Sequence, residues 1–193
     1  MPLLNQYGGT TSPKFLELKL ASTPGFFCEV IRAIFRSKKD ERSSVDVTEQ
    51  EKKIALNAYR LLSEWKTPPG YIPDGNYNGD ALIKWLDAVK KECAETGHLE
   101  VAMSHVGHVL IYTPADPDGL WIHHSAAEAL NAKDADVMRN GYRIACFNAR
   151  GVFSYSEGKE EKDLAEKYRE QAEKIESRGY YRFAEELRKL ADS

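Results

Sequence analysis

The stretch of sequence that decides the fold lies near the end of the chain, where residues 164–190 read LAEKYREQAEKIESRGYYRFAEELRKL. Before Gly179, apolar side chains recur every three or four residues, which is the period of one face of an α-helix. These side chains are Leu164, Tyr168, Ala172 and Ile175. A second stripe of the same period follows the glycine and contains Tyr180, Phe183, Ala184, Leu187 and Leu190. Because a short connection makes consecutive amphipathic helices antiparallel neighbours, the stretch predicts a helical hairpin.

The same helical period runs through most of the remaining chain. Apolar stripes predict further helices over residues 13–20, 24–36, 49–66, 81–96, 98–113, 117–130 and 135–149. Together with the hairpin, they amount to about nine helices and no strand. We therefore expect an all-α fold of antiparallel hairpins, arranged either as an α-solenoid or as an irregular helical bundle.

Capping signals mark several helix ends. Thr48 and Glu51 have the spacing of a capping box, in which each side chain binds a free backbone amide at the start of a helix. Asp80 is a candidate N-cap, and Gly97 is a candidate C′ glycine at the other end of the same helix. The Asp-Pro pair at 116–117 is typical of a helix start, because proline is tolerated in the first turn.

The sequence predicts one helical domain over residues 1–193. A charged, polar stretch near 38–47 and a short stretch between helices near 151–158 are the candidate points of subdivision. The final hairpin has the small-residue and aromatic spacing of a tetratricopeptide-like hairpin. Apolar residues directly after Met1, and a helix that runs to the last residues, lead us to expect a piece of a longer protein.

Composition excludes several classes of protein. The sequence has no run of about 18 or more apolar residues that would span a membrane, and residues 1–6 lack the pattern of a signal peptide. Cys28, Cys93 and Cys146 are odd in number and widely spaced, which favours buried thiols in a reducing cytoplasm over a disulfide framework. A formal net charge of −3 gives no basic footprint for nucleic acid. We therefore expect a cytoplasmic protein without a membrane or nucleic-acid partner.

Three segments resemble the C-terminal region of large uncharacterised bacterial helical-repeat proteins. They are TPGFFCEVIRAIFRSK at 23–38, EWKTPPG at 64–70 and DPDGLWIHH at 116–124, and they occur in the same order. The resemblance implies a long helical-repeat body in a bacterial protein. Such proteins are sometimes labelled as parts of addiction modules or of phage defence, and the resemblance brings no catalytic residues with it.

Aromatic residues in loops are the candidate partner-binding residues. The long irregular loop at 69–79 carries Tyr71 and Tyr77, and loops of this length are often functional or packed on the domain. Trp121 and His123 follow the Pro-Asp-Gly turn that comes before a helix. Because exposed Trp and Tyr anchor many partners, we predict that these four residues contact a partner, with ordinary core packing as the alternative.

The histidines offer a different hypothesis, a metal site. His105 and His108 are three residues apart and share one helix face, while His124 and Glu128 are four apart on the next helix. If the two helices came together, three imidazoles and one carboxylate would be able to hold a metal ion. The sequence has no HExxH motif, and histidines on polar helix surfaces are the simpler interpretation, which we favour.

Motifs for phosphate binding and for an activated nucleophile are also missing from the sequence, which contains no Walker motif, GxGxxG or GxSxG. We therefore predict a non-enzymatic helical scaffold without a cofactor, which binds another protein or the rest of a longer chain. One alternative hypothesis is a metal-assisted hydrolase or nuclease built on the histidines. The other is a toxin–antitoxin or phage-defence regulator.

Overall fold

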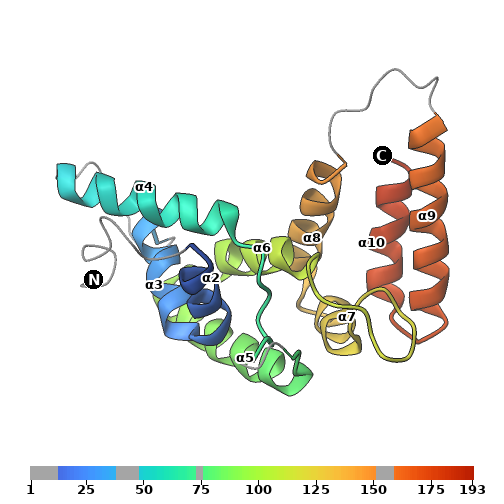
Figure 1. Cartoon of the computed structure of the whole chain (residues 1–193), viewed down its shortest axis with the longest axis horizontal. Helices are drawn as coiled ribbons and strands as arrows, with labels where there is room; N and C mark the ends of the chain where they lie inside the picture. The colour runs from blue at the N-terminus through green and yellow to red at the C-terminus, as the bar shows by residue number, and fades with distance from the viewer. Residues whose placement is uncertain (1–12, 38–47, 73–75, 151–158) are drawn as a thin grey trace. The chain divides into compact units, whose positions relative to one another are not determined.

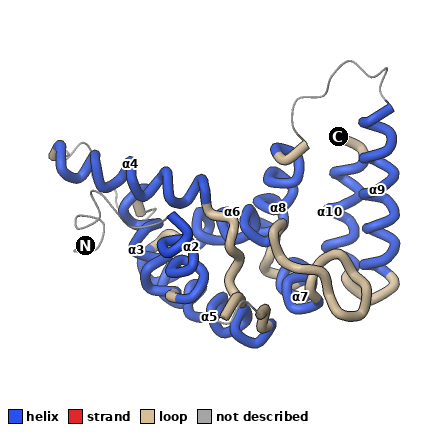
Figure 2. The backbone as a smooth tube through the Cα atoms, in the orientation of Figure 1, coloured by secondary structure: helices blue, strands red, loops and turns tan. Residues whose placement is uncertain are grey.

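The computed structural model of the protein describes residues 13–37, 48–72, 76–150 and 159–193 (Figure 1). Within these ranges it contains nine helices and no strand, so the predicted all-α fold is confirmed (Figure 2). The sequence predicted one helical domain, whereas contacts within the chain divide it into two compact units between Ala102 and Met103. The predicted points of subdivision, near 38–47 and 151–158, lie outside the described residues.

The first unit is built around helix α3. Its helices are α2 (Pro13–Ser22), α3 (Pro24–Ile34), α4 (Glu49–Glu64) and α5 (Gly79–Thr96), and α6 (Leu99–Leu110) begins in it. α3 packs against α2, α4 and α5, and it buries Phe27 in a cluster with Trp65 and Trp85. The Phe27 ring centroid lies 5.4 Å from that of Trp65 and 5.0 Å from that of Trp85. The Trp85 indole N–H also donates to the carbonyl of Leu20 at 3.1 Å, which joins α5 to α2.

Two of the three capping predictions in this unit are confirmed. Thr48 and Glu51 form the predicted capping box at the start of α4. Gly97 ends α5 with a φ of +76°, a left-handed conformation that glycine adopts without a steric cost. The prediction for Asp80 is wrong, because the Asn78 side chain caps α5 by accepting the amide of Ala81 at 3.0 Å. Asp80 lies one residue inside the helix, where its charge still favours the N-terminal end.

The second unit contains the predicted helical hairpin. Its helices are α7 (His124–Asn131), α8 (Asp136–Asn148), α9 (Lys159–Glu176) and α10 (Tyr181–Ala191). α9 and α10 are joined by a turn at Gly179, whose φ is +86°. The predicted stripes meet between them, and their buried members are Tyr168, Ala172, Ile175, Phe183, Ala184, Leu187 and Leu190. α10 also packs against α7 and α8.

The helix predicted over 117–130 begins only at His124. A turn replaces its first part, because the Asp116 carboxylate accepts the amide of Asp118 at 3.0 Å and the Asp116 amide donates to the Leu120 carbonyl at 2.9 Å. Gly119 completes the turn with a φ of +89°. An Asp-Pro pair suits a turn as well as a helix start, and here the following glycine decides for the turn.

Helices α6 and α8 cross at two glycines, Gly107 and Gly141. A Cβ atom on Gly107 would overlap the carbonyl oxygen of Met138, and one on Gly141 would overlap the carbonyl oxygen of Ser104. The two backbones are therefore in direct contact, at a separation that no larger residue permits.

The three cysteines lie in helices and are free thiols. Cys28 and Cys93 are fully buried in the first unit, where their sulfur atoms lie 3.4 Å apart. Cys146 is half-buried in α8, and burial raises the pKa of its thiol to about 11, which keeps it protonated and unreactive at neutral pH. None of the described helices combines the length and apolar character needed to cross a membrane.

Candidate functional site

The loop between α6 and α7 is organised by the side chain of Asp116. This carboxylate is 4% exposed and accepts three hydrogen bonds. The amide of Asp118 donates to Oδ1 at 3.0 Å, while the amide and the Nδ1 atom of His124 both lie 2.7 Å from Oδ2. The carboxylate thus binds a free backbone amide at the start of α7 from outside the helix. These hydrogen bonds fix the position of His124.

Asp116 is ionised at neutral pH. Burial raises the pKa of this carboxyl group, but the hydrogen bonds from the Asp118 and His124 amides and the His124 ring outweigh burial. The pKa therefore falls from 3.8 to about 2. The loop consequently holds a fixed negative charge directly beside the His124 imidazole.

His123 and His124 lie side by side at the start of α7. Their ring centroids are 4.2 Å apart, and the side chain of His124 is 59% exposed. His123 is the N-cap of the helix, with its Nδ1 atom 2.9 Å from the hydroxyl of Ser125. Burial and the nearby His124 lower the pKa of His123, which favours a neutral ring with a lone pair at neutral pH.

Three potential metal donors converge at this loop. One donor atom from each of Asp116, His123 and His124 lies within 4.8 Å of the other two. Of the four residues predicted as metal ligands, only His124 belongs to this group; among the described residues, no such group contains His105, His108 or Glu128. Asp116 was not among the predicted ligands, because its Asp-Pro motif was assigned to a helix start.

His105 and His108 form a separate pair on α6. Their rings meet edge to face, with centroids 5.4 Å apart. Burial lowers the pKa of His105 from 6.5 to about 4, with a smaller contribution from His108, and burial also lowers the pKa of His108. Both rings are therefore neutral at pH 7, and their packing in the domain explains their presence without a ligand.

This burial predicts an acid-sensitive fold. Between pH 6.5 and 4 the unfolded chain binds a proton at His105 that the folded chain does not, so stability falls as the pH decreases. We expect a loss of about 2 kcal/mol in unfolding free energy between pH 7 and pH 5 from this residue. Guanidinium unfolding at the two pH values measures it. His105→Gln should reduce the difference by most of that amount, and an unchanged difference would contradict the assignment.

The residues predicted to bind a partner all make contacts inside the protein. Tyr71 and Tyr77 pair as an isolated antiparallel bridge, and their rings pack edge to face with centroids 5.5 Å apart. The Trp121 ring lies 6.3 Å from the Phe183 ring. His123 caps α7, as described above. These contacts give each residue a structural role, and partner binding by them stays a prediction.

A larger surface feature lies along α9 and α10. It is a groove of about 1130 Å³ between the end of α8, residues 161–173 of α9 and the end of α10. Its apolar lining includes Phe147, which is 51% exposed, together with Leu164 and Leu190. Five acidic and three basic side chains complete the lining.

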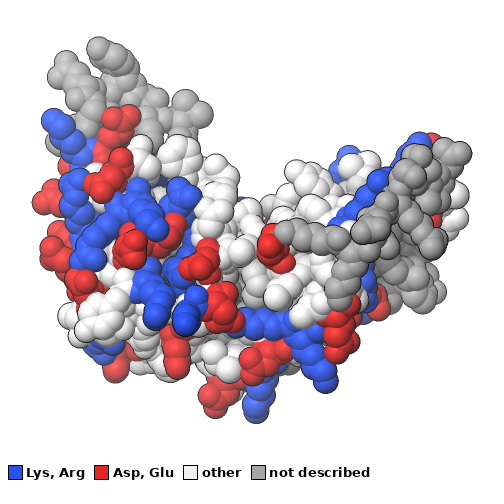
Figure 3. Space-filling view, turned by 180° about the vertical axis from the view of Figure 1, so that it is seen from behind, with Lys and Arg blue, Asp and Glu red and all other residues white. Residues whose placement is uncertain are grey.

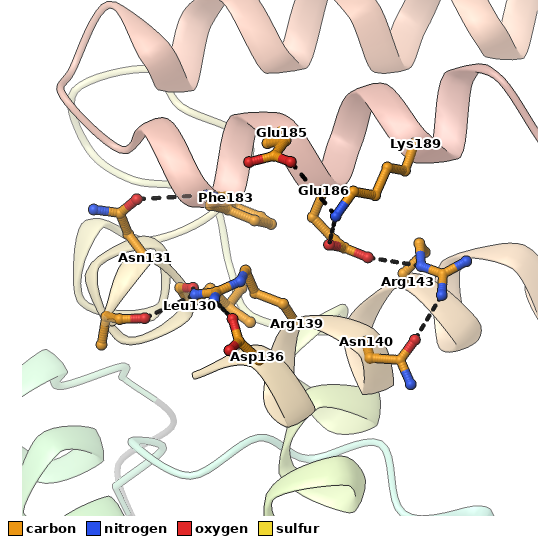
Figure 4. A network of polar contacts seen from close by, with 11 residues as sticks. Leu130, Asn131, Asp136, Arg139, Asn140, Arg143, Phe183, Glu185, Glu186 and Lys189 are labelled. Atoms are coloured by element: carbon orange, nitrogen blue, oxygen red, sulfur yellow. Dashed lines mark hydrogen bonds and ion pairs between the residues drawn. The ribbon is translucent and has the colours of Figure 1, made fainter. Parts of the chain in front are cut away.

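A second depression, of about 480 Å³, separates α8 from α10, and ion pairs occupy much of it (Figure 4). Glu186 forms ion pairs with Arg143 at 2.7 Å and with Lys189 at 3.2 Å, and Lys189 also pairs with Glu185. Such charge pairing recurs elsewhere: Figure 3 shows Lys and Arg interleaved with Asp and Glu on the face it presents. These paired charges are typical of helix surfaces and helix contacts.

The described part of the chain therefore presents two features suited to ligands, the donor group at Asp116, His123 and His124 and the groove along α9 and α10. The first has the chemistry of a cation site, and the second has the size of a peptide site. Comparisons of the chain with models of protein families, with curated proteins and with solved structures find no match.

Proposed function

We propose that this chain is a non-enzymatic, helical protein-interaction domain that binds a basic amphipathic helix of another protein. The groove along α9 and α10 supports the proposal. Its volume of about 1130 Å³ exceeds that of most small-molecule pockets and suits one face of a helix.

The apolar part of the groove supplies an anchor point. Phe147 is 51% exposed, and the guanidinium of Arg150 lies over its ring, 4.8 Å from the centroid. Arg150 also donates to the Leu190 carbonyl at 2.6 Å, which holds this arginine against the end of α10. An exposed aromatic ring of fixed position, next to aliphatic side chains, is a typical anchor for apolar residues of a helical partner.

The charged part of the groove selects a basic partner. Arg150 and Arg169 are engaged within the domain, the latter with Asp192 at 3.3 Å. The exposed residues Glu166, Glu170 and Glu173 are spaced by four and three positions, so they follow one side of α9 along the groove. Lys or Arg side chains beside the apolar face of a bound helix would meet these carboxylates.

Two designed peptides test this proposal. One is a fluorescent helix of about 18 residues made of leucine and lysine, and the other has glutamate in place of lysine. We expect the lysine peptide to bind at least about tenfold more tightly by fluorescence anisotropy, with weaker binding at higher salt. Phe147→Ala and Glu166→Lys/Glu170→Lys should each weaken binding by about tenfold or more.

The matched control is Glu64→Lys/Asp87→Lys, which makes the same change of charge at exposed positions of α4 and α5. It should bind the lysine peptide as the unmodified protein does, apart from a small effect of net charge. Equal affinity for both peptides, or equal losses in the groove and control variants, would show that the attraction is nonspecific and would refute the proposal.

A further inference from the structure

The donor group before α7 has the composition of a transition-metal site. It contains one carboxylate and two imidazoles, from Asp116, His123 and His124, and none of the three residues lines the groove. Two nitrogen donors and one oxygen donor suit zinc and disfavour magnesium and calcium, which prefer oxygen ligands. We propose that these three residues bind a zinc ion, a function separate from the groove.

Contacts within the loop already position the carboxylate ligand. The amides of Asp118 and His124 hold both oxygens of the Asp116 carboxylate, at 3.0 and 2.7 Å. An outer set of hydrogen bonds of this kind orients a metal ligand and limits its motion. Asp116 also supplies the negative charge that offsets the partial positive charge at the start of α7, which by itself opposes a cation.

The two imidazoles have a nitrogen to offer. Nδ1 of His123 accepts the Ser125 amide at 3.3 Å, so its lone pair faces the start of α7, and a zinc ion bound there would take the place of this hydrogen bond. Nδ1 of His124 lies 2.7 Å from the Asp116 carboxylate, and a zinc ion between them would replace the shared proton.

Closure of the site needs only a small rearrangement. Ligand atoms around a tetrahedral zinc ion are about 3.3 Å apart. The three donor atoms already lie within 4.8 Å of one another, so they need to approach only slightly to reach that spacing. The His124 side chain is 59% exposed and can rotate towards the ion. Three protein ligands leave the fourth position of a tetrahedral zinc ion to water.

Titration of the untagged chain, residues 1–193, with zinc chloride tests the site. We expect one zinc ion per chain by calorimetry and by elemental mass spectrometry after gel filtration, with a Kd of about 10 μM or tighter. Cobalt substituted for zinc should give the visible absorption of a tetrahedral complex. Magnesium and calcium should not compete at about a hundredfold excess.

Two variants locate the binding. His124→Ala removes an exposed ligand and should weaken zinc binding at least tenfold while the circular dichroism spectrum stays unchanged. His105→Gln, in the separate histidine pair of α6, should leave zinc binding unchanged. A chain that binds no zinc, unchanged binding in His124→Ala, or a tenfold loss in His105→Gln would each overturn the proposal.

Discussion

Replacing Gly107 by alanine is expected to lower the unfolding free energy of the protein by about 3 kcal/mol. The added Cβ would overlap the carbonyl oxygen of Met138 and approach the backbone nitrogen of Tyr142 to 2.8 Å. Both atoms belong to the backbone of α8, so no side-chain rotation relieves the overlap. The helices must separate, and the contacts beside the crossing are then lost. Gly141→Ala should act in the same direction, because its Cβ would overlap the carbonyl oxygen of Ser104.

The matched control for this prediction is Gly25→Ala. Gly25 also lies in a helix, but the nearest atom to a Cβ there is a carboxylate oxygen of Glu92 at 3.9 Å, an ordinary contact distance. Alanine should be neutral or stabilise the protein slightly, because it restricts the unfolded chain more than glycine does. Guanidinium unfolding followed by circular dichroism compares the variants. Equal stability of Gly107→Ala and Gly25→Ala would contradict the close crossing.

The two glycines also predict non-additive behaviour. Both substitutions force apart the same pair of helices, so the first one relieves part of the cost of the second. The double variant should therefore lose less stability than the sum of the single losses. Additive losses would indicate that each glycine acts through its own helix alone.

The sequence predicted those features that depend on local spacing. The stripe at Tyr168, Ala172 and Ile175 marked the inner face of α9, and the Thr48–Glu51 pair marked the start of α4. In both cases the interacting residues lie within one helix or one hairpin, so their spacing in the sequence determines their geometry.

Features that join distant segments were not predictable in this way. In the sequence, Gly107 and Gly141 are only residues of low helix propensity within two predicted helices. Nothing in the sequence shows that these two helices cross. The spacing of His105 and His108 correctly placed them together, but it did not show which other donors lie near. Asp116 reaches His124 only because the intervening loop turns back at Gly119.

The groove illustrates the same limit. Charges of both signs recur at helical spacing along α9, a pattern that by itself indicates a solvated helix face and agrees with the exposure of these side chains. Phe147 lies near the end of another helix, α8. Because it is far from Leu164 and Leu190 in the sequence, the sequence does not show that the three residues line one groove. An acidic stripe beside an exposed aromatic ring becomes visible only after the hairpin is folded.

Replacing Arg139 by methionine is expected to lower the unfolding free energy by about 3 kcal/mol. The Arg139 side chain is 5% exposed, and its guanidinium holds the end of α7 (Figure 4). It donates to the carbonyls of Leu130 and Ala132, both at 2.7 Å, and it pairs with Asp136. Methionine fills much of the same volume but leaves both carbonyls without their donor. Lysine keeps the charge but loses the forked geometry of the guanidinium. The unfolding free energy of Arg139→Lys should therefore lie between those of Arg139→Met and the unmodified protein.

The control variant, Asp136→Ala, separates the carbonyl contacts from the ion pair. The Asp136 side chain is 84% exposed, so its ion pair with Arg139 is worth less than about 1 kcal/mol. If the carbonyl contacts carry the stability, Asp136→Ala should be nearly neutral in guanidinium unfolding while Arg139→Met is not. Equal losses in the two variants would mean that the ion pair dominates instead. Because α7 also carries His123 and His124 at its other end, Arg139→Met should weaken zinc binding too, through loss of helix order rather than of a ligand.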